Sequence, residues 1–334
     1  MAVTIRDVAA RAGVSVGTVS NVLNDRGSVN EATVAAVRGA IRSLGYVRND
    51  AARQLRAGRS RGIGLVVLDV ANPFFAAVAR GAESRAAEGG RMILLASSEQ
   101  DTDRENAYLE LFLEQRLSGV LISPTGDSHS ALHRLRDAGV PVVVVDGGAE
   151  DGSTLPSVSV DDVEGGHLAV APLLERGRRR IVFVGGPLST RQVADRLEGA
   201  RRAIAEVPDA QLDVVTRGDL TVLEGRAAGE QIRERRLLPD AVFAANDLLA
   251  VGILQALTMT GNVRVPEDVA LVGYDDIDFA SATVVPLTSV RQPAEMMGRT
   301  AVDLILRYGE GTLSGQDAAV RFRPELVVRA SSGG

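Results

Sequence analysis

Residues 3–24, VTIRDVAARAGVSVGTVSNVLN, decide the fold of the N-terminal part of this 334-residue chain. Thr4 precedes Asp7 by three positions, which is the spacing of a capping hydroxyl and its acidic partner at the start of a helix. Apolar residues then recur at helical spacing, namely Ile5, Val8, Ala9 and Ala12. This spacing predicts a first helix over about residues 5–12.

A second helix is predicted directly after a turn. Gly13 supplies the turn, and Ser15 is placed to cap the helix that follows. The apolar positions of that helix are Val19, Val22 and Leu23. Two short helices joined by a three-to-four-residue turn containing glycine form a helix-turn-helix unit.

A third helix is expected to complete a small core. Residues 33–44 follow Asn30, and Gly45 ends their helical pattern. The apolar positions are Val34, Val37, Ile41 and Leu44. The sequence therefore predicts an all-α headpiece.

The outward face of the second helix is suited to a DNA major groove, because its residues are small. They are Val16, Gly17, Ser20 and Asn21. Asparagine pairs in bidentate fashion with adenine, and a valine methyl group meets the thymine methyl group. A glycine inside a helix costs about 1 kcal/mol relative to alanine. Gly17 therefore either permits close approach to the duplex or lies in a frayed first turn, where the cost is small.

The positive charge of the chain is concentrated near its N-terminus. Residues 1–60 hold nine arginines and four acidic residues, whereas the remainder holds 28 arginines and 39 acidic residues, and the chain has no lysine. A basic head on an acidic body indicates contact with a polyanion, although chance clustering on a solvated face would give the same counts.

Together these segments match a known family. Residues 3–9, 12–15, 18–24 and 44–46 resemble the corresponding segments of the lactose-repressor (LacI/GalR) family of transcription factors. The resemblance implies that the headpiece binds DNA. It assigns base reading to Val16, Gly17 and Asn21, and it assigns contacts with the DNA backbone to Ser15, Thr18, Ser20, Asn24 and Tyr46. Backbone contacts set the register, and base contacts specify the sequence.

Residues 51–56, AARQLR, resemble the hinge helix of the same family, which folds on cognate DNA and inserts a leucine into the minor groove. Leu55 stands at the position of that leucine, and Arg56 beside it is expected to follow the groove. An apolar wedge unstacks a base step and bends the duplex. One departure is Arg48, where most members carry a proline before the asparagine, here Asn49.

From Gly62 onward, apolar runs of strand length alternate with helical stretches. The runs are Ile63–Val67, Met92–Ala96, Val120–Ser123, Val140–Val145, Ile181–Val184, Val242–Ala245 and Val269–Tyr274. Such alternation predicts parallel sheets in doubly wound α/β lobes, and two groups of runs predict two lobes. This part resembles the type I periplasmic-binding-protein fold that forms the effector domain of the family.

The resemblance also implies the domain limits. We expect a helix-turn-helix domain at 1–48, a hinge helix and linker at 49–60, and an effector-binding domain at 61–334. Within the last, the N-lobe is expected at about 61–162 and 292–323. The C-lobe is expected at about 163–291 and 324–334, with a strand around Glu325–Val328.

Polar residues at strand ends are expected to bind a ligand between the lobes, since ligands of this fold lie at the carboxyl ends of strands. With the aromatic residue that the family stacks on its ligand, they are Asp69, Asn72, Phe74, Arg196, Asn246, Asp275 and Gln292. Such groups suit vicinal hydroxyls, and an aromatic face covers a sugar ring, so a carbohydrate is the expected effector. A purine fits less well, because Thr190, Gln192 and Leu220 replace residues of the family's purine-responsive member. Asp247 and Asp276 have a simpler alternative as helix caps.

Other features exclude whole classes of function. The longest apolar runs, such as Ile63–Leu68, are far shorter than the ~20 residues of a membrane span. The N-terminus lacks the apolar core of a signal peptide, so a cytoplasmic protein is expected. With no cysteine and three histidines, the sequence predicts neither a metal site nor a cofactor, and it shows no catalytic constellation.

The sequence thus predicts a homodimeric transcriptional repressor, because a two-fold protein matches a palindromic operator. A solute-binding protein for a transporter shares the two-lobed fold, but it would need a signal peptide and would have no use for residues 1–60. An enzyme built on the same body would need a reactive cluster of residues.

Overall fold

The computed structural model describes residues 3–24, 29–46, 60–125, 129–147, 155–259, 263–313 and 318–333. The chain divides into two compact units, Met1–Arg59 and Ser60–Gly334, and each is described by itself. The hinge residues Leu55 and Arg56 lie outside the described residues.

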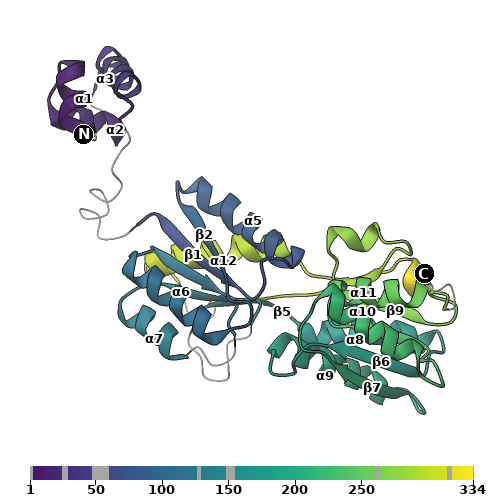
Figure 1. Ribbon diagram of the computed structural model, residues 1–334. Coiled ribbons are helices and arrows are strands. Elements are labelled where there is room, and N and C mark those ends of the chain that lie inside the picture. The colour runs from purple at the N-terminus through teal and green to yellow at the C-terminus, as the bar shows by residue number, and fades with distance from the viewer. Residues whose placement is uncertain are drawn as a thin grey trace. The chain divides into compact units, whose positions relative to one another are not determined.

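Three helices form the described part of the first unit (Figure 1). They are α1 (Ile5–Ala12), α2 (Val16–Leu23) and α3 (Glu31–Leu44). Each begins at the side chain predicted to cap it, because Thr4, Ser15 and Asn30 accept a hydrogen bond from a backbone N–H three residues later. Gly13 and Gly45 end α1 and α3 with φ angles of 67° and 62°, a left-handed conformation that glycine adopts without steric cost.

The apolar stripes of the three helices meet in one small core. Val8, Val19 and Val37, one from each helix, are fully buried. Ala9 and Ala40 pack beside them in the same cluster. Because this core takes up the inner face of α2, the opposite face remains open to solvent.

The second unit is built on two six-stranded sheets with helices on both faces (Figure 1). The first sheet holds β1 (Gly62–Val67), β2 (Met92–Ser97), β3 (Gly119–Ile122), β4 (Val142–Val145), β5 (Ser157–Val160) and β11 (Ala319–Phe322). The second holds β6 (Arg180–Gly185), β7 (Gln211–Thr216), β8 (Ala241–Ala244), β9 (Ala270–Asp275), β10 (Thr288–Arg291) and β12 (Glu325–Val327).

The strand orders are β11-β5-β4-β3-β1-β2 and β12-β10-β9-β8-β6-β7. All neighbouring strands pair in parallel except β12, which runs antiparallel to β10. The described chain passes from one sheet to the other after β5, after β10 and after β11. Each sheet with its helices is called a lobe below, the first lobe carrying β1 and the second carrying β6.

Helices cover both faces of each sheet. In the first lobe they are α5 (Pro73–Glu88) and α12 (Ala294–Gly309) on one side, and α6 (Thr102–Glu114) and α7 (His129–Asp137) on the other. In the second lobe they are α8 (Asp162–Glu175) and α9 (Arg191–Ala205), and opposite them α10 (Val222–Arg233) and α11 (Asp247–Thr258). The late helix α12, yellow in Figure 1, lies beside α5 although about 200 residues separate them in sequence.

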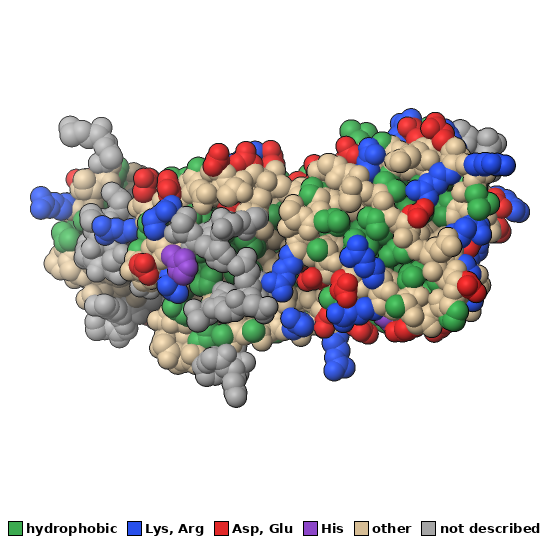
Figure 2. Space-filling view, turned by 90° about the horizontal axis from the view of Figure 1, so that it is seen from below, with side chains coloured by type: hydrophobic (Ala, Val, Ile, Leu, Met, Phe, Trp, Pro, Cys, Tyr) green, Lys and Arg blue, Asp and Glu red, His purple; other side chains and the backbone are tan. Residues whose placement is uncertain are grey.

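The outer surface of the second unit carries charges of both signs. Red and blue side chains are mixed over the right-hand lobe in Figure 2. Several belong to ion pairs one helical turn apart, such as Arg202 with Glu198 and Arg226 with Glu230. Interspersed charges of this kind keep a surface solvated without attracting a polyanion.

The predicted fold class is confirmed, since an all-α headpiece precedes two doubly wound, mainly parallel sheets. The seven strands predicted from apolar runs are present with ends within two residues of those expected. The apolar-run pattern missed β5, β7, β10 and β11. In the part of the chain that is described, no helix is both long and apolar enough to cross a membrane.

Candidate DNA interface and ligand pocket

The outward face of α2 presents the three residues expected to read bases. Val16 is 41% exposed, Gly17 is exposed and Asn21 is half-buried. A methyl group added at Gly17 would meet only the Ser15 Oγ, at 3.6 Å, which is ordinary van der Waals contact. Nothing within the described fold therefore requires a glycine at this position.

The residues expected to contact the DNA backbone lie at the ends of α2. Ser15 caps the helix by accepting from the Thr18 N–H at 3.0 Å, and their hydroxyl groups lie 2.9 Å apart. At the other end, the Asn24 amide donates to the Ser20 carbonyl at 2.8 Å. Tyr46, beyond α3, packs against the headpiece core. The four polar side chains of α2 are therefore held in pairs.

In the second unit, strained backbone gathers where strands end. Seven non-glycine residues have positive φ angles among the described residues, and five of them follow β2, β4 or β9 at the carboxyl end. These five are Glu99, Gln100, Asp146, Asp275 and Asp276. Such conformations cost of order 1–3 kcal/mol each and cluster at functional sites. The strain therefore marks the edge at which the two sheets face each other.

Arg196 is the centre of the polar cluster at this edge, although it is only 4% exposed. Its Nε donates to Asp162 Oδ1 at 2.8 Å, and its Nη1 donates to the Ala245 carbonyl at 2.7 Å. Its guanidinium carbon lies 3.7 Å from the centroid of the Tyr274 ring, and its Nη1 lies 3.8 Å from Asp275 Oδ1. The guanidinium plane is thereby fixed on both its edge and its face.

A close helix contact places Arg196. At Gly166 of α8, an added Cβ would lie 2.0 Å from the Arg196 carbonyl oxygen, and at Gly199 of α9 it would lie 1.9 Å from the Val163 carbonyl oxygen. Only glycine allows this approach of two backbones. The two glycines therefore bring α9 close enough to α8 for Arg196 to reach Asp162.

Asp275 follows β9 and faces the same cluster. It accepts a hydrogen bond from Gln292 Nε2 at 2.8 Å. Burial raises the pKa of Asp275 to about 6, against the opposing effects of Arg196 and of hydrogen bonds from Gln292 and Asn72. The carboxyl group is thus poised to change its protonation with a modest change in its surroundings.

Asp146 joins the two lobes at the same cluster. It follows β4 of the first lobe, and Gln192 on α9 of the second lobe donates from Nε2 to both its carbonyl oxygen and its Oδ2, the latter at 3.2 Å. Burial and the charge of Asp162 raise the pKa of Asp146 well above its ordinary value, while Arg196 lowers it.

Two acceptor atoms of this cluster lack a hydrogen-bond donor. Asp146 Oδ1 and Gln292 Oε1 are buried and unpartnered within the described residues. An unsatisfied buried acceptor costs about 1–3 kcal/mol. The cluster is therefore complementary to a ligand that brings hydroxyl or N–H donors.

Comparison with known proteins gives the same picture for the whole chain. Residues 4–49 match the model of bacterial regulatory proteins of the lacI family, and residues 170–332 match that of a periplasmic binding protein-like domain. The ribose operon repressor of Escherichia coli K12 is 36% identical over 98% of this chain and 99% of its own length. The chain belongs to the lacI family.

Solved structures agree with this assignment. The lac repressor dimer bound to operator and the anti-inducer ONPF superimposes with a TM-score of 0.87 and 28% identity, covering 99% of both chains. A LacI family transcriptional regulator of Enterococcus faecium with bound ribose superimposes with a TM-score of 0.73 and 27% identity, covering 81% of this chain and 98% of the other. Like these relatives, this lacI-family chain is a transcriptional regulator.

The predicted pocket residues of this lacI-family chain do not all meet. Arg196, Asp275 and Gln292 lie together. Asp69 is half-buried in a turn, where its Oδ1 accepts from the Ala71 N–H at 2.8 Å. Asn72, which contributes to the Asp275 environment, also caps α5.

Two further predicted residues are engaged within the second unit itself. Phe74 is 3% exposed and packs edge-on against Phe75 with ring centroids 5.1 Å apart. Asn246 caps α11 by accepting from the Leu249 N–H at 2.9 Å, and it donates to the Leu220 carbonyl. Both residues shape the wall of the lobe that carries them.

The structure corrects the alternative in which acids cap the following helices. Asn246, and not Asp247, is the cap of α11. Asp247 is fully buried and accepts from Ser289 Oγ at 2.7 Å and from the Ile277 N–H at 2.9 Å. Asp276 pairs with Arg291, at 2.8 Å. Both acids therefore tie β9 and β10 to their neighbours.

Sequence reasoning missed three residues of the pocket in this lacI-family chain. Asp146 follows the run Val142–Val145, so the strand-end rule that selected Asp275 would have found it. Asp162 and Gln192 are the first and second residues of α8 and α9 and carry no such local signal.

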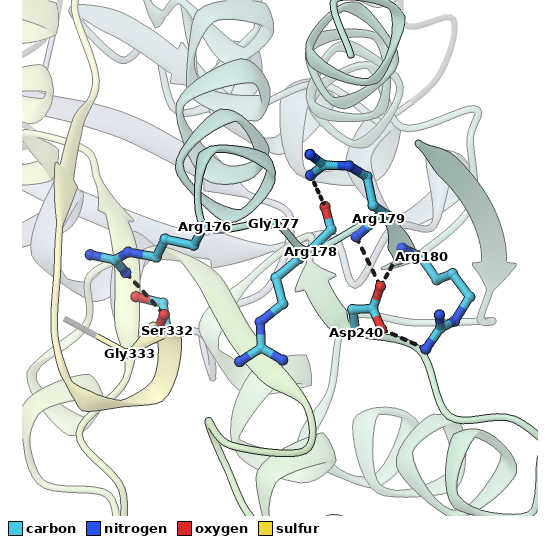
Figure 3. Close-up of a pocket in the computed structure, with 8 residues that line it drawn as sticks. All are labelled: Arg176, Gly177, Arg178, Arg179, Arg180, Asp240, Ser332 and Gly333. Carbon is cyan, nitrogen blue, oxygen red and sulfur yellow. Dashed lines mark hydrogen bonds and ion pairs between the residues drawn. The ribbon is translucent and has the colours of Figure 1, made fainter. Parts of the chain in front are cut away.

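A separate hollow of about 510 Å³ lies at the amino end of β6 (Figure 3). Four arginines line it, and their side chains fan apart. Arg176 donates to the Ser332 carbonyl at 3.0 Å, and Arg180 pairs with Asp240 at 2.5 Å. These arginines fasten the turn between α8 and β6 to its neighbours, so the hollow has a structural role.

Proposed function

We propose that this lacI-family regulator is a repressor that binds a palindromic operator as a homodimer and is controlled by a sugar held between its lobes. The ribose operon repressor and the operator-bound lac repressor dimer are its relatives, which supports this reading. We assign it no catalytic role and expect it to act in the cytoplasm, where its DNA lies.

The headpiece is the proposed operator-binding module. Val16, Gly17 and Asn21 are proposed to read bases, since they form the outward face of α2. The proposed backbone contacts are Ser15, Thr18, Ser20, Asn24 and Tyr46. Leu55 and Arg56 are proposed to enter the minor groove, with one leucine from each subunit at the central step of the operator.

The observation that carries the sugar assignment is the pair of unpartnered acceptors, Asp146 Oδ1 and Gln292 Oε1, beside Asp275 and Arg196. A sugar offers several hydroxyl donors at short spacing, and its ring oxygen and hydroxyl oxygens accept from a guanidinium group. We therefore propose that these four residues form the core of the sugar site. Asp69, Asn72, Phe74 and Asn246 are proposed to complete its walls.

Regulation requires that the sugar favour one arrangement of the lobes over another. The side chains of the site come from both lobes, because Asp146 follows β4 and Arg196 lies on α9. A ligand that binds both sides therefore changes the free energy of closure, which is the coupling that control of operator binding needs. The domain limits proposed for the three parts are 1–48, 49–60 and 61–334.

Fluorescence anisotropy tests the proposal directly. A labelled fragment from the protein's own promoter region is titrated at fixed salt, with random DNA of equal length as the control. We expect tighter binding to the promoter fragment and a shift of its midpoint on addition of one sugar. Equal binding to both DNAs would refute the assignment as a sequence-specific repressor.

A thermal-shift screen against a panel of sugars, with D-ribose included, identifies the effector class. A ligand at 100 times its Kd stabilises the folded chain by about 2.7 kcal/mol, which is readily measured. Purine bases are included as the competing class. A shift with a purine and with none of the sugars would overturn the sugar assignment.

A further inference from the structure

The loop after β2 is held in an unfavourable shape. Glu99 and Gln100 are successive non-glycine residues in the left-handed region, with φ angles of 52° and 58°. The Ser98 N–H donates to the Val67 carbonyl at 2.9 Å on one side of them, and Asp101 caps α6 on the other. Surrounding contacts thus impose a conformation that the residues themselves disfavour.

This shape aims one side chain at the other lobe. Gln100 Nε2 donates to Asp219 Oδ1 at 2.9 Å, and Asp219 belongs to the loop after β7 in the second lobe. Both side chains are half-buried. The hydrogen bond therefore joins the two lobes at a point shielded in part from water, where such bonds are stronger than on an open surface.

The receiving side is as firmly anchored as the donating side. Asp219 Oδ1 also accepts from the Leu220 N–H at 2.7 Å, and the Leu220 carbonyl accepts from the Asn246 amide at 3.1 Å. Asn246 in turn caps α11. With both ends fixed to rigid elements, the Gln100–Asp219 bond forms only when the lobes stand at this separation.

The bond lies apart from the polar cluster around Arg196. Within the described residues, the hydrogen bonds and ion pairs of Gln100 and Asp219 include none with Arg196, Asp146 or Asp275. By contrast, the Gln192–Asp146 contact also joins the lobes but belongs to that cluster. A ligand in the cluster must rearrange the second contact and leaves the first in place.

We propose that the Gln100–Asp219 hydrogen bond is a latch that favours the closed arrangement of the lobes and so sets how much effector is needed to shift the protein. The inference rests on the proposed function, because only control of operator binding by the lobes makes the latch regulatory. A contact that differs between two states biases their populations without touching the ligand.

The distance between the lobes in the ligand-free protein tests the latch. The chain has no cysteine, so Glu114→Cys on α6 and Arg201→Cys on α9 place one spin label on each lobe, and dilution with unlabelled protein isolates pairs within one chain. In this background Gln100→Glu sets two carboxylates against each other. We expect the population at the closed distance to fall at least about fivefold, the low end of typical coupling between sites.

Two further variants complete the test. Gln231→Glu makes the same charge change at an exposed position of α10 and should leave the distances unchanged. Adding Asp219→Asn to Gln100→Glu restores a donor opposite an acceptor and should return much of the closed population. Unchanged distances in Gln100→Glu, or an equal change in Gln231→Glu, would overturn the latch.

The DNA readout separates the latch from the proposed function. If wild-type protein binds its promoter DNA no better than random DNA, the proposed function fails, whereas the distance measurement still decides whether Gln100 and Asp219 hold the lobes together. If both hold, Gln100→Glu should move the effector midpoint by the same factor as the loss of closed population, because coupling is reciprocal.

Discussion

The guanidinium carbon of Arg196 lies 3.7 Å from the centroid of the Tyr274 ring, while its Nε donates to Asp162 at 2.8 Å. The planar side chain thus stacks on an aromatic face and pairs with a carboxylate at the same time. Lysine reproduces neither geometry, because its ammonium group is a compact charge without a fork of donors. The site therefore depends on arginine in particular.

Arg196→Met should strongly destabilise the second unit, because it leaves Asp162 and Asp275 buried without their cation. Removing one partner of a buried ion pair costs about 3–5 kcal/mol. Urea unfolding measures the loss. Arg202→Met on the same helix is the matched control, since its pair with Glu198 is exposed and such pairs contribute about 0.3–0.5 kcal/mol. Equal unfolding midpoints in the two variants would remove Arg196 from the centre of the site.

Sugar affinity should depend on pH through Asp275. Its pKa is about 6, and hydroxyl donors favour the ionised carboxylate, so binding releases a proton. Affinity should fall about fourfold between about pH 7.5 and about pH 5.5, where roughly three quarters of this carboxyl group is protonated. Titration calorimetry in buffers of different ionisation enthalpy counts the proton. In Asp275→Asn the pH dependence should be lost, and its persistence would point to another group.

The unliganded protein should show a stability effect of the opposite sense. A carboxyl group with a raised pKa binds its proton more tightly in the folded state, so its contribution to the free energy of unfolding falls as pH rises from about 4 to about 6. For Asp275 the change amounts to at most about 3 kcal/mol. Urea unfolding of wild type and Asp275→Asn across this interval isolates it, and parallel curves would contradict the assignment.

Gly17→Ala should separate folding from recognition. A methyl group at this position meets only Ser15 at 3.6 Å, and alanine favours a helix by up to about 1 kcal/mol, so headpiece stability should stay the same or rise. Operator affinity should nevertheless fall about tenfold, about 1.4 kcal/mol, because the methyl group occupies the space of the duplex. Gly39→Ala in α3, where an added methyl group meets nothing within 4 Å, is the control and should bind operator as wild type does. If both variants bind equally well, Gly17 does not approach the DNA.

Leu55→Ala tests the proposed minor-groove wedge. The variant should lose affinity for the specific operator by about tenfold or more and retain its affinity for random DNA, since only a bent specific site takes up the wedge. Anisotropy titrations at one salt concentration compare the two ligands. Equal losses on both DNAs would instead assign Leu55 a general role in the linker.

Much of the headpiece was predictable because its signals are local. Thr4, Ser15 and Asn30 each cap a helix within three residues of themselves, and Gly13 and Gly45 end helices by a backbone conformation that glycine adopts freely. Continuous apolar runs likewise predicted the buried central strands, because both faces of a parallel sheet are covered.

The strands that were missed lack that composition. β7 lies at an edge and exposes most of its residues, so its sequence does not read as a buried strand. β5 and β10 are buried, yet their segments SVSV and TSVR are half polar. Ser289 is satisfied there only by Asp247, a residue from another part of the chain.

The sequence by itself determined the headpiece, the doubly wound lobes and the strand ends at which polar residues gather, because each of these follows from neighbours within a few positions. Only the tertiary structure decided that Asp146, Asp162, Gln192 and Arg196 meet, since they belong to segments joined by helix packing and by the approach of two lobes. It also decided that Phe74 and Asn246 are engaged within the fold. Burial and pairing across the lobes are properties of the packed chain, and no local pattern encodes them.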